Sequence, residues 1–487
     1  MRTTRRATLV AAVGLATLSG CGILQGSGTG ERNDDPDQSA GTGTSPSTEP
    51  ETGDTATETT STPEETPSDG SDVTTGVTLD HAVDVLVYEH DGAFRAVSND
   101  EIIASHPDDL GRVINDAQSE LSEGYILVAT DGPSSTEISH GDDITIGSID
   151  RRTKLVPAED TDGSFKMYLA SNGLDDGRFE SVCVDMENRS GPAVQSEGFT
   201  DVDFDDLLVR NTGGYEGHGL ALVGGRQADV RDCRFTGISG DALRVADSSD
   251  VSVRNCESVG AKYGIYARNS SGLLVHGFRS RESQFNSVAM YDYTENWKVI
   301  GCRAVDDGHT PFAASSARNG SFVGCLAEGT TAEGEGGFEI EYKAGHDSDN
   351  REAPVEGCSV VSCTAVDCNM GFYAREDRSN YTTDTEVVRP KFVDCTAVGC
   401  ETGLFVGGNV VEAVVRGFDA VDCETDLVDE GTRTIVEGRS ENEGDPATRG
   451  QWNGHAETAA RFDVTVEDTA NDTLYRATTA GTWQQLT

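Results

Sequence analysis

Positive charge is scarce in this chain. Its 487 residues include 85 Asp and Glu but only 37 Lys and Arg, which gives a formal net charge of −48 at pH 7. Proteins that bind nucleic acids need basic patches to neutralise phosphates, so this balance excludes nucleic acid as a partner. The acidic residues are spread along the whole chain, and Lys is especially rare. This pattern is typical of proteins that stay soluble in high salt, and we expect a halophilic source.

Long apolar runs are missing as well. The run from Leu9 to Leu18 is shorter than the roughly 20 residues that a helix needs to cross a bilayer. It follows Thr4-Arg5-Arg6-Ala7-Thr8-Leu9, a twin-arginine export pattern, and it ends in Leu18-Ser19-Gly20-Cys21, which resembles a lipobox. Residues 1–21 are therefore predicted to be a lipoprotein signal peptide. We expect Cys21 to carry a lipid that anchors the protein to the extracellular face of the cell membrane.

Apolar residues are almost absent between Gly26 and Gly76, where Thr, Ser, Glu, Asp, Pro and Gly dominate. Such a stretch cannot bury enough apolar surface to fold. Residues 22–76 are therefore predicted to be a disordered tether, extended by repulsion between like charges.

Helical periodicity is absent from the region between Phe179 and Asp429, which instead repeats about every 23 residues. One apolar column consists of Leu220, Leu243, Ile265, Val288, Phe312, Phe338, Phe372, Leu404 and Leu427. A second column, half a repeat away, consists of Val182, Leu207, Cys233, Cys256, Phe278, Cys302, Cys325, Cys363, Cys395 and Phe418. Short runs with period two, such as Val251-Ser252-Val253, indicate half-buried strands.

These patterns predict an all-β fold, a parallel β-helix solenoid of about ten coils over residues 151–440. Residues 77–150 contain one amphipathic helix, predicted from Asp108 to Leu121, and should form an N-terminal cap. A cap is needed because an open first coil would expose unpaired strand edges. Residues 441–487 are predicted to form a small C-terminal β cap from a pair of strands.

At this point the chain resembles a known family. Segments such as Val253-Arg254-Asn255-Cys256-Glu257-Ser258 and Tyr263-Gly264-Ile265-Tyr266-Ala267-Arg268-Asn269 are similar to coils of right-handed parallel β-helix proteins of the pectate-lyase-like superfamily. The resemblance covers about 300 residues of the 487. It implies the fold, but the superfamily includes polysaccharide lyases, glycoside hydrolases, epimerases, phage tailspikes and proteins without catalytic activity.

The chain has 12 cysteines, 11 of them beyond the predicted signal peptide. Most occupy the second column, where they would stack as small buried side chains. A disulfide framework is the alternative, and the turn-proximal cysteines are its best candidates: Cys358, Cys368, Cys400 and Cys423. No cysteine spacing matches a zinc site, since Cys363 and Cys368 are five residues apart with no His nearby in sequence.

Residues between the inward positions of the first column should point outward and share one face. They form a strip of side chains that suit sugars, because aromatic rings stack on sugar faces and Arg pairs with acidic groups. The predicted substrate-binding residues are Arg244, Tyr266, Arg268, Tyr291, Tyr373 and Arg375. Two long polar insertions, Lys343–Glu356 and Glu376–Arg389, should flank this strip.

Candidate catalytic residues lie beside the strip. Glu339 and Glu341 are two residues apart on one strand face, so their carboxyl groups could reach the separations used in glycoside cleavage. His346 on the adjoining loop is a possible partner, with Asp347 and Asp349 nearby, and His309 with Asp306 and Asp307 sits one coil earlier. These groups could act as acid, base or calcium ligands, although in a chain this acidic they could equally be solvated surface.

Motifs of the polygalacturonase branch are not reproduced. Gly217-His218-Gly219 is present, but Asn211-Thr212-Gly213 lacks the expected Asp, and Asp241 follows His218 instead of preceding it. The order of these residues therefore makes His218 a turn residue in this interpretation.

Five Asn-x-Ser/Thr sequons are candidate glycosylation sites in an exported protein: Asn188, Asn269, Asn319, Asn380 and Asn471. Two functions remain open from the sequence. The first is a surface lipoprotein that binds a polysaccharide or cell-surface glycan and cleaves it by lyase or hydrolase chemistry. The second is a non-enzymatic adhesion or structural module.

Overall fold

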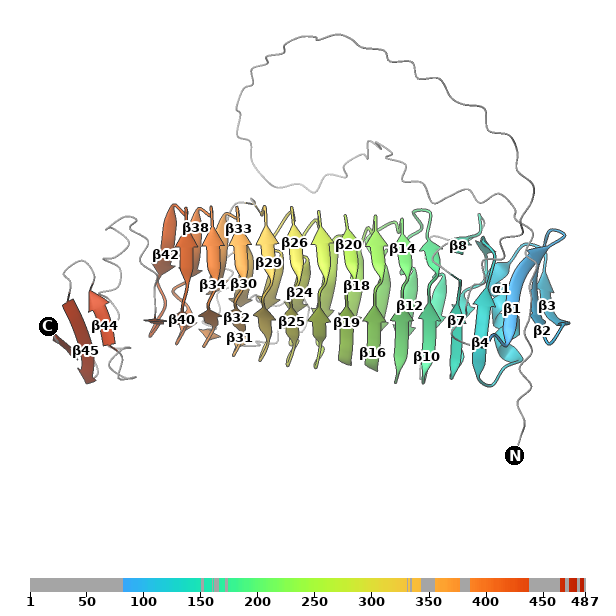
Figure 1. The fold of residues 1–487 in the computed structure, drawn as a ribbon, viewed down its shortest axis with the longest axis horizontal. Coiled ribbons are helices and arrows are strands. Elements are labelled where there is room, and N and C mark those ends of the chain that lie inside the picture. The colour runs from blue at the N-terminus through green and yellow to red at the C-terminus, as the bar shows by residue number, and fades with distance from the viewer. Residues whose placement is uncertain are drawn as a thin grey trace, which may run out of the picture. The chain divides into compact units, whose positions relative to one another are not determined.

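The fold is taken from a computed structural model, which describes residues 82–149, 153–159, 161, 166–170, 174–330, 332, 335–342, 355–376, 386–437, 465–468, 473–479 and 482–485. The predicted signal peptide and tether, including Cys21, lie outside these residues. The described chain forms successive coils, and each coil contributes one strand to each of three parallel sheets (Figure 1). The predicted β-helix of about ten coils is therefore confirmed, with twelve strands in each of two sheets.

Sheet A has sixteen strands and includes the antiparallel N-terminal hairpins. In spatial order they are β3 (Glu101–His106), β2 (Ala93–Ser98), β1 (Val85–His90), β4 (Gly124–Val128), β7 (Ile144–Gly147), β10 (Gly177–Glu180), β13 (Val202–Asp205), β16 (Arg226–Arg231), β19 (Ser249–Arg254), β22 (Leu274–His276), β25 (Lys298–Ile300), β28 (Ser321–Val323), β32 (Ser359–Val361), β36 (Lys391–Val393), β40 (Val414–Arg416) and β43 (Ile435–Glu437).

Sheet B has twelve short strands, each of which follows a strand of sheet A along the chain. They are β5 (Gly132–Ser134), β8 (Lys154–Pro157), β11 (Cys183–Asp185), β14 (Leu208–Arg210), β17 (Arg234–Thr236), β20 (Glu257–Val259), β23 (Arg279–Arg281), β26 (Arg303–Val305), β29 (Leu326–Glu328), β33 (Thr364–Val366), β37 (Thr396–Val398) and β41 (Asp419–Val421).

Sheet C also has twelve strands and contains the first apolar column. They are β6 (Ile138–Ser139), β9 (Tyr168–Ala170), β12 (Val194–Glu197), β15 (Leu220–Val223), β18 (Asp241–Ala246), β21 (Tyr263–Arg268), β24 (Val288–Tyr291), β27 (Phe312–Ser315), β30 (Gly336–Tyr342), β34 (Met370–Glu376), β38 (Thr402–Val406) and β42 (Thr425–Asp429). A further small sheet joins β31 (Val355–Glu356), β35 (Val387–Val388) and β39 (Val410–Val411).

The first apolar column forms one continuous register from Leu220 to Leu427, as predicted. Its centre is a stack of three rings. The ring centroids of Phe312 and Phe338 are 4.9 Å apart with planes 9° from parallel, and those of Phe338 and Phe372 are 5.0 Å apart at 10°. All three side chains are fully buried, so this stack is part of the main hydrophobic core.

The turns between sheets A and B explain the second column. In ten successive coils the residue before the column position has a left-handed backbone, which Asp, Asn and Gly tolerate best. These residues are Ser181, Asp206, Asp232, Asn255, Gly277, Gly301, Gly324, Ser362, Asp394 and Gly417. The bend turns the next side chain inward, and every residue of the second column is buried.

The single described helix caps the first coils. Helix α1 (Leu110–Ser119) is slightly shorter than predicted and begins after Asp109, whose Oδ1 accepts a hydrogen bond from the Arg112 amide at 3.1 Å. Its polar face bonds to the backbone around β6. The Asn115 side chain donates to the Glu137 carbonyl at 2.8 Å, and that of Gln118 donates to the Ser139 carbonyl at 2.6 Å. These bonds satisfy an edge that would otherwise be unpaired, which confirms the predicted capping helix.

The eleven described cysteines are free thiols. The expectation that Cys358, Cys368, Cys400 and Cys423 form disulfides is therefore wrong. Their thiols instead donate to backbone carbonyls within the coil, as Cys400 does to Val398 at 3.6 Å. Thiols of neighbouring coils also hydrogen-bond to each other, and burial together with this bond raises the pKa of Cys363. Stacking of small buried side chains is the correct interpretation.

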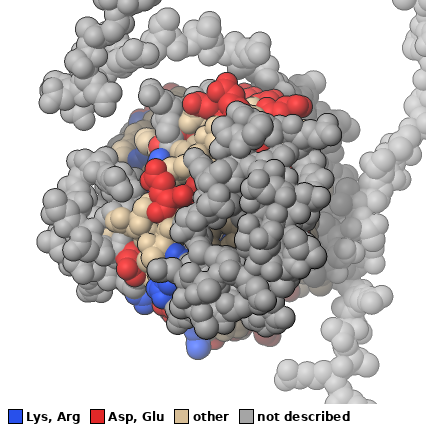
Figure 2. Space-filling model, turned by 90° about the vertical axis from the view of Figure 1, so that its left-hand side faces the viewer, with Lys and Arg blue, Asp and Glu red and all other residues tan. Residues whose placement is uncertain are grey.

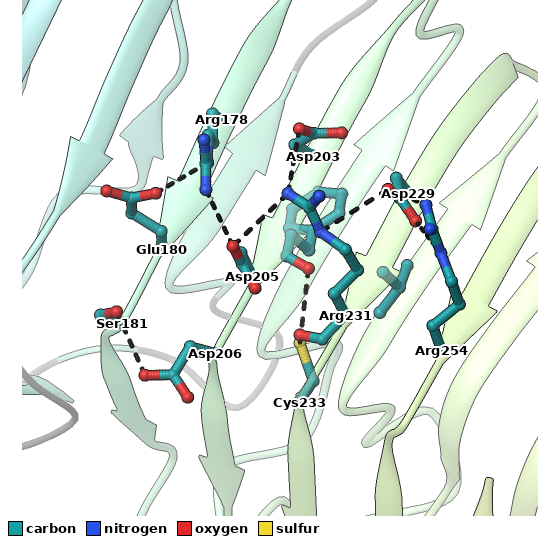
Figure 3. A network of polar contacts seen from close by, with 12 residues as sticks. Arg178, Glu180, Ser181, Asp203, Asp205, Asp206, Asp229, Arg231, Cys233 and Arg254 are labelled. Atoms are coloured by element: carbon teal, nitrogen blue, oxygen red, sulfur yellow. Dashed lines mark hydrogen bonds and ion pairs between the residues drawn. The ribbon is translucent and has the colours of Figure 1, made fainter. Parts of the chain in front are cut away.

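The outer face of sheet A is tied together by ion pairs between coils (Figure 3). Arg178 contacts Glu180 at 2.7 Å and Asp205, one coil away, at 2.8 Å. Arg231 reaches both Asp203 and Asp205 at 3.4 Å. The charges do not alternate strictly along the register, since Arg231 is followed by Arg254, but each Arg of this group lies beside a carboxylate of a neighbouring coil. Individual exposed pairs of this kind stabilise the fold little.

Acidic residues outnumber the single lining Arg, Arg178, around one cleft. A cleft of about 810 Å³ near the start of sheet A is lined by Asp84, Asp143, Asp176, Asp201 and Asp203, among others. Burial raises the pKa of Asp201, and the charges of nearby aspartates raise it further. In Figure 2, which shows the side that faces left in Figure 1, acidic side chains also form patches on the described surface.

The C-terminal region contains three antiparallel strands, not the predicted pair: β44 (Thr465–Asp468), β45 (Thr473–Thr479) and β46 (Thr482–Gln485). Within the described residues, no helix has both the length and the apolar character needed to cross a membrane.

Candidate functional site

The outward residues of sheet C fall into two adjacent columns, which together we call the sheet C face. One column runs Arg244, Tyr266, Ala289, Ala313, Glu339 and Tyr373. The other runs Arg268, Tyr291, Ser315, Glu341 and Arg375. The structure therefore brings all the predicted strip residues together on one side of one sheet.

Burial divides this face. The side chains of Arg244 and Arg375 are 21% and 27% exposed, and Tyr266 and Arg268 are also partly exposed. By contrast Tyr373, Glu339, Glu341 and Tyr291 are 0%, 1%, 4% and 8% exposed. These four side chains are therefore buried although their strand positions face outward from the core. The small side chains of Ala289 and Ala313 leave a recess, which Tyr291 fills together with Tyr263 and Tyr266.

Three glutamates form a cluster at the β30 end of the face, which we call the carboxylate cluster: Glu335, Glu339 and Glu341. The Tyr373 hydroxyl lies 2.7 Å from Glu339 Oε2 and 3.2 Å from Glu335 Oε2. Ser315 donates to Glu339 Oε1 at 2.8 Å, and Arg375 Nε lies 3.3 Å from Glu341 Oε1. The cluster is therefore held by hydroxyl groups and one guanidinium.

Glu339 and Glu341 are in direct hydrogen-bond contact. Burial alone would raise the pKa of Glu339, but the bonds from Glu341, Tyr373 and Ser315 and the nearby His309 lower it below its ordinary value. Two buried carboxyl groups in contact share one proton, because both cannot be ionised at that distance. They are closer than the 5 Å or more, roughly, that separates the paired carboxyls of glycosidases, so this part of the expectation is not met.

His309 joins the cluster from the turn before β27. Its Nε2 lies 3.1 Å from Glu335 Oε1. The neighbouring Thr310 hydroxyl is 2.9 Å from Glu335 Oε2 and 2.8 Å from the Tyr373 hydroxyl, although Thr310 and Tyr373 are 63 residues apart. The predicted partner His346, with Asp347 and Asp349, lies outside the described residues.

Asp307 is not a surface carboxylate. It accepts hydrogen bonds from the Ser283 amide at 3.0 Å and the Ser287 hydroxyl at 2.5 Å, and burial raises its pKa to about 7. Asp307 therefore connects two turns through buried hydrogen bonds. This is a structural role, different from the surface acid, base or calcium ligand that we considered from the sequence. Asp306 occupies the left-handed turn position just before it.

His218 and Asp241 form a second pair of buried titratable side chains. The sequence analysis did not predict this pair as a site, because Asp241 follows His218 in the chain instead of preceding it. His218 and Asp241 have side chains only 4% and 6% exposed, with Nδ1 and Oδ2 3.4 Å apart. The Asp241 amide donates to His218 Nδ1 at 3.0 Å, and Nε2 lies 3.2 Å from Glu216 and 3.1 Å from Arg244. Burial and then Arg244 lower the pKa of His218 to about 4, while burial raises that of Asp241 to about 6.

Aromatic side chains lie between these two groups. Tyr263 stacks on Phe285 with centroids 5.3 Å apart at 14°, and Tyr266 meets Tyr291 edge-on at 5.6 Å. Lys262 Nζ sits 3.6 Å from the centre of the Tyr215 ring, which is 70% exposed. The sequence contained a signal for these residues: Tyr215 shortly precedes β15, and Lys262, one of the few Lys of the chain, directly precedes β21.

Three of the five sequons lie in the described chain. Asn188, Asn269 and Asn319 are exposed and have φ of 66°, 46° and 49°, which places them at turns between strands. Asn380 and Asn471 lie outside the described residues.

Comparison with known proteins supports the fold. Residues 192–388 match the family described as right handed beta helix region. No curated protein matches the chain. This match covers less than half of the chain. It therefore identifies the β-helix architecture of the matched coils only.

Solved structures with similar folds are distant in sequence. The catalytic unit of a thermostable GH87 alpha-1,3-glucanase from Streptomyces thermodiastaticus has a TM-score of 0.54 at 13% identity, covering 70% of this chain and 68% of the other. A GH87 alpha-1,3-glucanase catalytic domain in complex with tetrasaccharides has a TM-score of 0.52 at 11% identity, covering 70% and 66%. The mannuronan C-5 epimerase A-module of Azotobacter vinelandii has a TM-score of 0.49 at 11% sequence identity, and the match covers 68% of this chain and 96% of the other. At these identities the likeness to the two glucanase structures establishes a shared fold, which the family match identifies as a right-handed β-helix.

Proposed function

We propose that this protein is a lipoprotein on the extracellular face of the cell membrane that binds a polysaccharide with acidic groups on its sheet C face and cleaves it. One observation carries the proposal. Partly exposed Arg and Tyr side chains lie in register between two groups of buried titratable residues. Cations and rings bind sugar chains, and titratable groups with shifted pKa values mark sites of proton transfer.

The fold of the glucanases gives further support, because one of them was solved with tetrasaccharides bound. The basic residues on the face favour an anionic chain. Arg244, Arg268 and Arg375 lie along it on different coils, where they could pair with successive acidic groups.

Lyase chemistry fits the carboxylate cluster better than hydrolysis. A hydrolase needs two separated carboxyl groups, whereas Glu339 and Glu341 touch. In a β-elimination, the Glu339 carboxylate takes the proton next to the uronate carboxyl group and the C4=C5 double bond forms as the C4–O bond breaks. Glu341, which donates its proton to Glu339 in the resting pair, passes that proton to the leaving glycosidic oxygen, and Arg375 stabilises the charge that develops on the uronate.

A non-enzymatic adhesion function is the second candidate, and one observation favours it. Both oxygens of Glu339 already accept hydrogen bonds from Ser315 and Tyr373, and Glu341 is paired with Arg375. Carboxylates engaged in this way could serve only to stabilise three successive coils.

Glu341→Gln separates the two functions. If Glu341 transfers the proton, this variant should lose roughly 100-fold or more of kcat on an acidic polysaccharide, because Gln keeps the shape without the proton chemistry. Binding should stay within about threefold. Turnover is measured in molar salt as unsaturated uronate ends, across a panel of polysaccharides, with Glu257→Gln on sheet B as the matched control. Binding without turnover by the wild type would establish adhesion instead, and full activity of Glu341→Gln would refute the assignment.

Cys21→Ser tests the location. We expect this variant to leave the membrane fraction, either released into the medium or retained as unprocessed precursor, because the lipid would be the sole attachment to the membrane. Fractionation of cells followed by immunoblotting measures the change. Wild-type-like membrane association of the variant would contradict lipid anchoring.

A further inference from the structure

We infer that His309, Glu335 and Glu339 form a binding site for one divalent metal ion of the zinc class. One ligand atom from each side chain can be chosen so that all three lie within 4.8 Å of one another. They come from three different places in the chain, the turn before β27, the turn before β30 and β30 itself. A single ion could therefore bind all three side chains without unfolding any strand.

The choice of metal follows from the ligand types. Calcium and magnesium prefer sites built from oxygen atoms alone, whereas an imidazole with carboxylates suits zinc and similar transition metals. The calcium expected from the acidic sequence is thus not the ion that this set favours. Three protein ligands also leave a coordination position for water or substrate.

The surroundings support metal binding. Metal-ligating carboxylates are normally oriented by hydrogen bonds from a second layer of residues. Here Thr310 orients Glu335, while Ser315 and Tyr373 orient Glu339, at distances between 2.7 and 2.9 Å. Glu339 is 1% exposed, so its position is set by packing as well.

Access and charge are also suitable. The side chains of His309 and Glu335 are 30% and 18% exposed, which leaves a path from solvent to the ligand atoms. The nearby Arg375 is paired with Glu341, and so the charge of Glu335 and Glu339 remains available to a cation. The site shares Glu339 with the proposed lyase chemistry, but its test measures metal binding and needs no substrate, so the failure of one proposal can be told from the failure of the other.

The test uses the folded full-length chain in molar salt, stripped of metal with a chelator. Titration with Zn²⁺, followed by calorimetry, should show one equivalent bound per chain. His309→Gln should weaken binding roughly tenfold or more, and so should Glu335→Gln, whereas the exposed His276→Gln serves as control and should bind like the wild type. Circular dichroism of each variant checks folding, and if His309→Gln does not fold, Glu335→Gln decides the outcome.

Co²⁺ provides a spectroscopic check. Bound cobalt should give visible d–d bands that disappear in His309→Gln, without the near-ultraviolet charge-transfer band of a thiolate ligand, since the cysteines are not ligands here. Three results would overturn the inference: no stoichiometric binding, binding unchanged by both substitutions, or displacement of Zn²⁺ by an equal concentration of Ca²⁺ or Mg²⁺. Polysaccharide binding by the metal-free protein would leave the proposed function intact.

Discussion

Phe338→Ala should lower the free energy of unfolding by roughly 3–5 kcal/mol. The ring is fully buried between Phe312 and Phe372, and Phe322 meets it edge-on at 6.1 Å. Truncation removes contacts on both faces of the ring and leaves a cavity between coils that are fixed by their backbone ladders. The surrounding coils cannot close over such a space, because the spacing between parallel strands is set by their hydrogen bonds.

Denaturant unfolding at constant molar salt measures this effect. Leu274→Ala, at a partly exposed position on the outer face of sheet A, is the control and should change stability by less than about 1 kcal/mol. A similarly small effect at Phe338 would mean that the register of sheet C is wrong. The sheet C face would then be wrong too, since a slip of one residue exchanges inward and outward side chains.

Removal of salt should abolish the native fold. The chain has a formal charge of −48, and repulsion between its carboxylates extends over a Debye length of about 3 Å at 1 M salt but about 30 Å at 0.01 M. The cleft that contains Asp84, Asp176, Asp201 and Asp203 shows where this repulsion is concentrated. We expect a cooperative thermal transition by circular dichroism at molar salt and loss of the β signal at 0.01 M.

The pH dependence of the stability, measured at intermediate salt, is an independent check that repulsion between carboxylates is the cause. The pKa values of Asp201 and Asp203 are raised in the folded protein, by burial first, so the native state takes up protons more readily than the unfolded chain. Stability should therefore rise as the pH falls toward those raised pKa values. A melting curve that is indifferent to salt between 0.01 M and 1 M would show that the acidic composition has another origin.

Much of the fold could be predicted because it depends on local periodicity. The first column from Leu220 to Leu427 follows from a repeat of apolar residues, and the register of nine strands agrees with it. Helix α1 was also recognisable, from the apolar spacing of Leu110, Val113, Ile114 and Ala117. The strands β4 to β7 lie in the region predicted as the N-terminal cap, because they precede the clear repeat.

The site was harder to predict because burial of outward residues depends on their neighbours in adjacent coils. Period-two alternation places Glu339 and Tyr373 outside the core, but nothing in the local sequence shows that Thr310 and Ser315 will surround them. In the same way, the order of motifs did not reveal that His218 and Asp241 would meet. Contacts between coils depend on the lengths of the intervening turns, which vary from coil to coil.

The left-handed residues between sheets A and B recur once per coil, and this recurrence determines which insertions and deletions the fold can accept. From Asp232 to Asn255 the chain completes one turn of the helix and returns to the same backbone conformation, one coil further along. Each such unit contacts mainly the units before and after it. Duplication or deletion of one complete coil would therefore leave every remaining turn and strand with a neighbour of the same kind. We therefore expect the protein to tolerate the insertion or deletion of a whole coil. Insertion or deletion of part of a coil would shift the apolar columns out of register with the neighbouring coils.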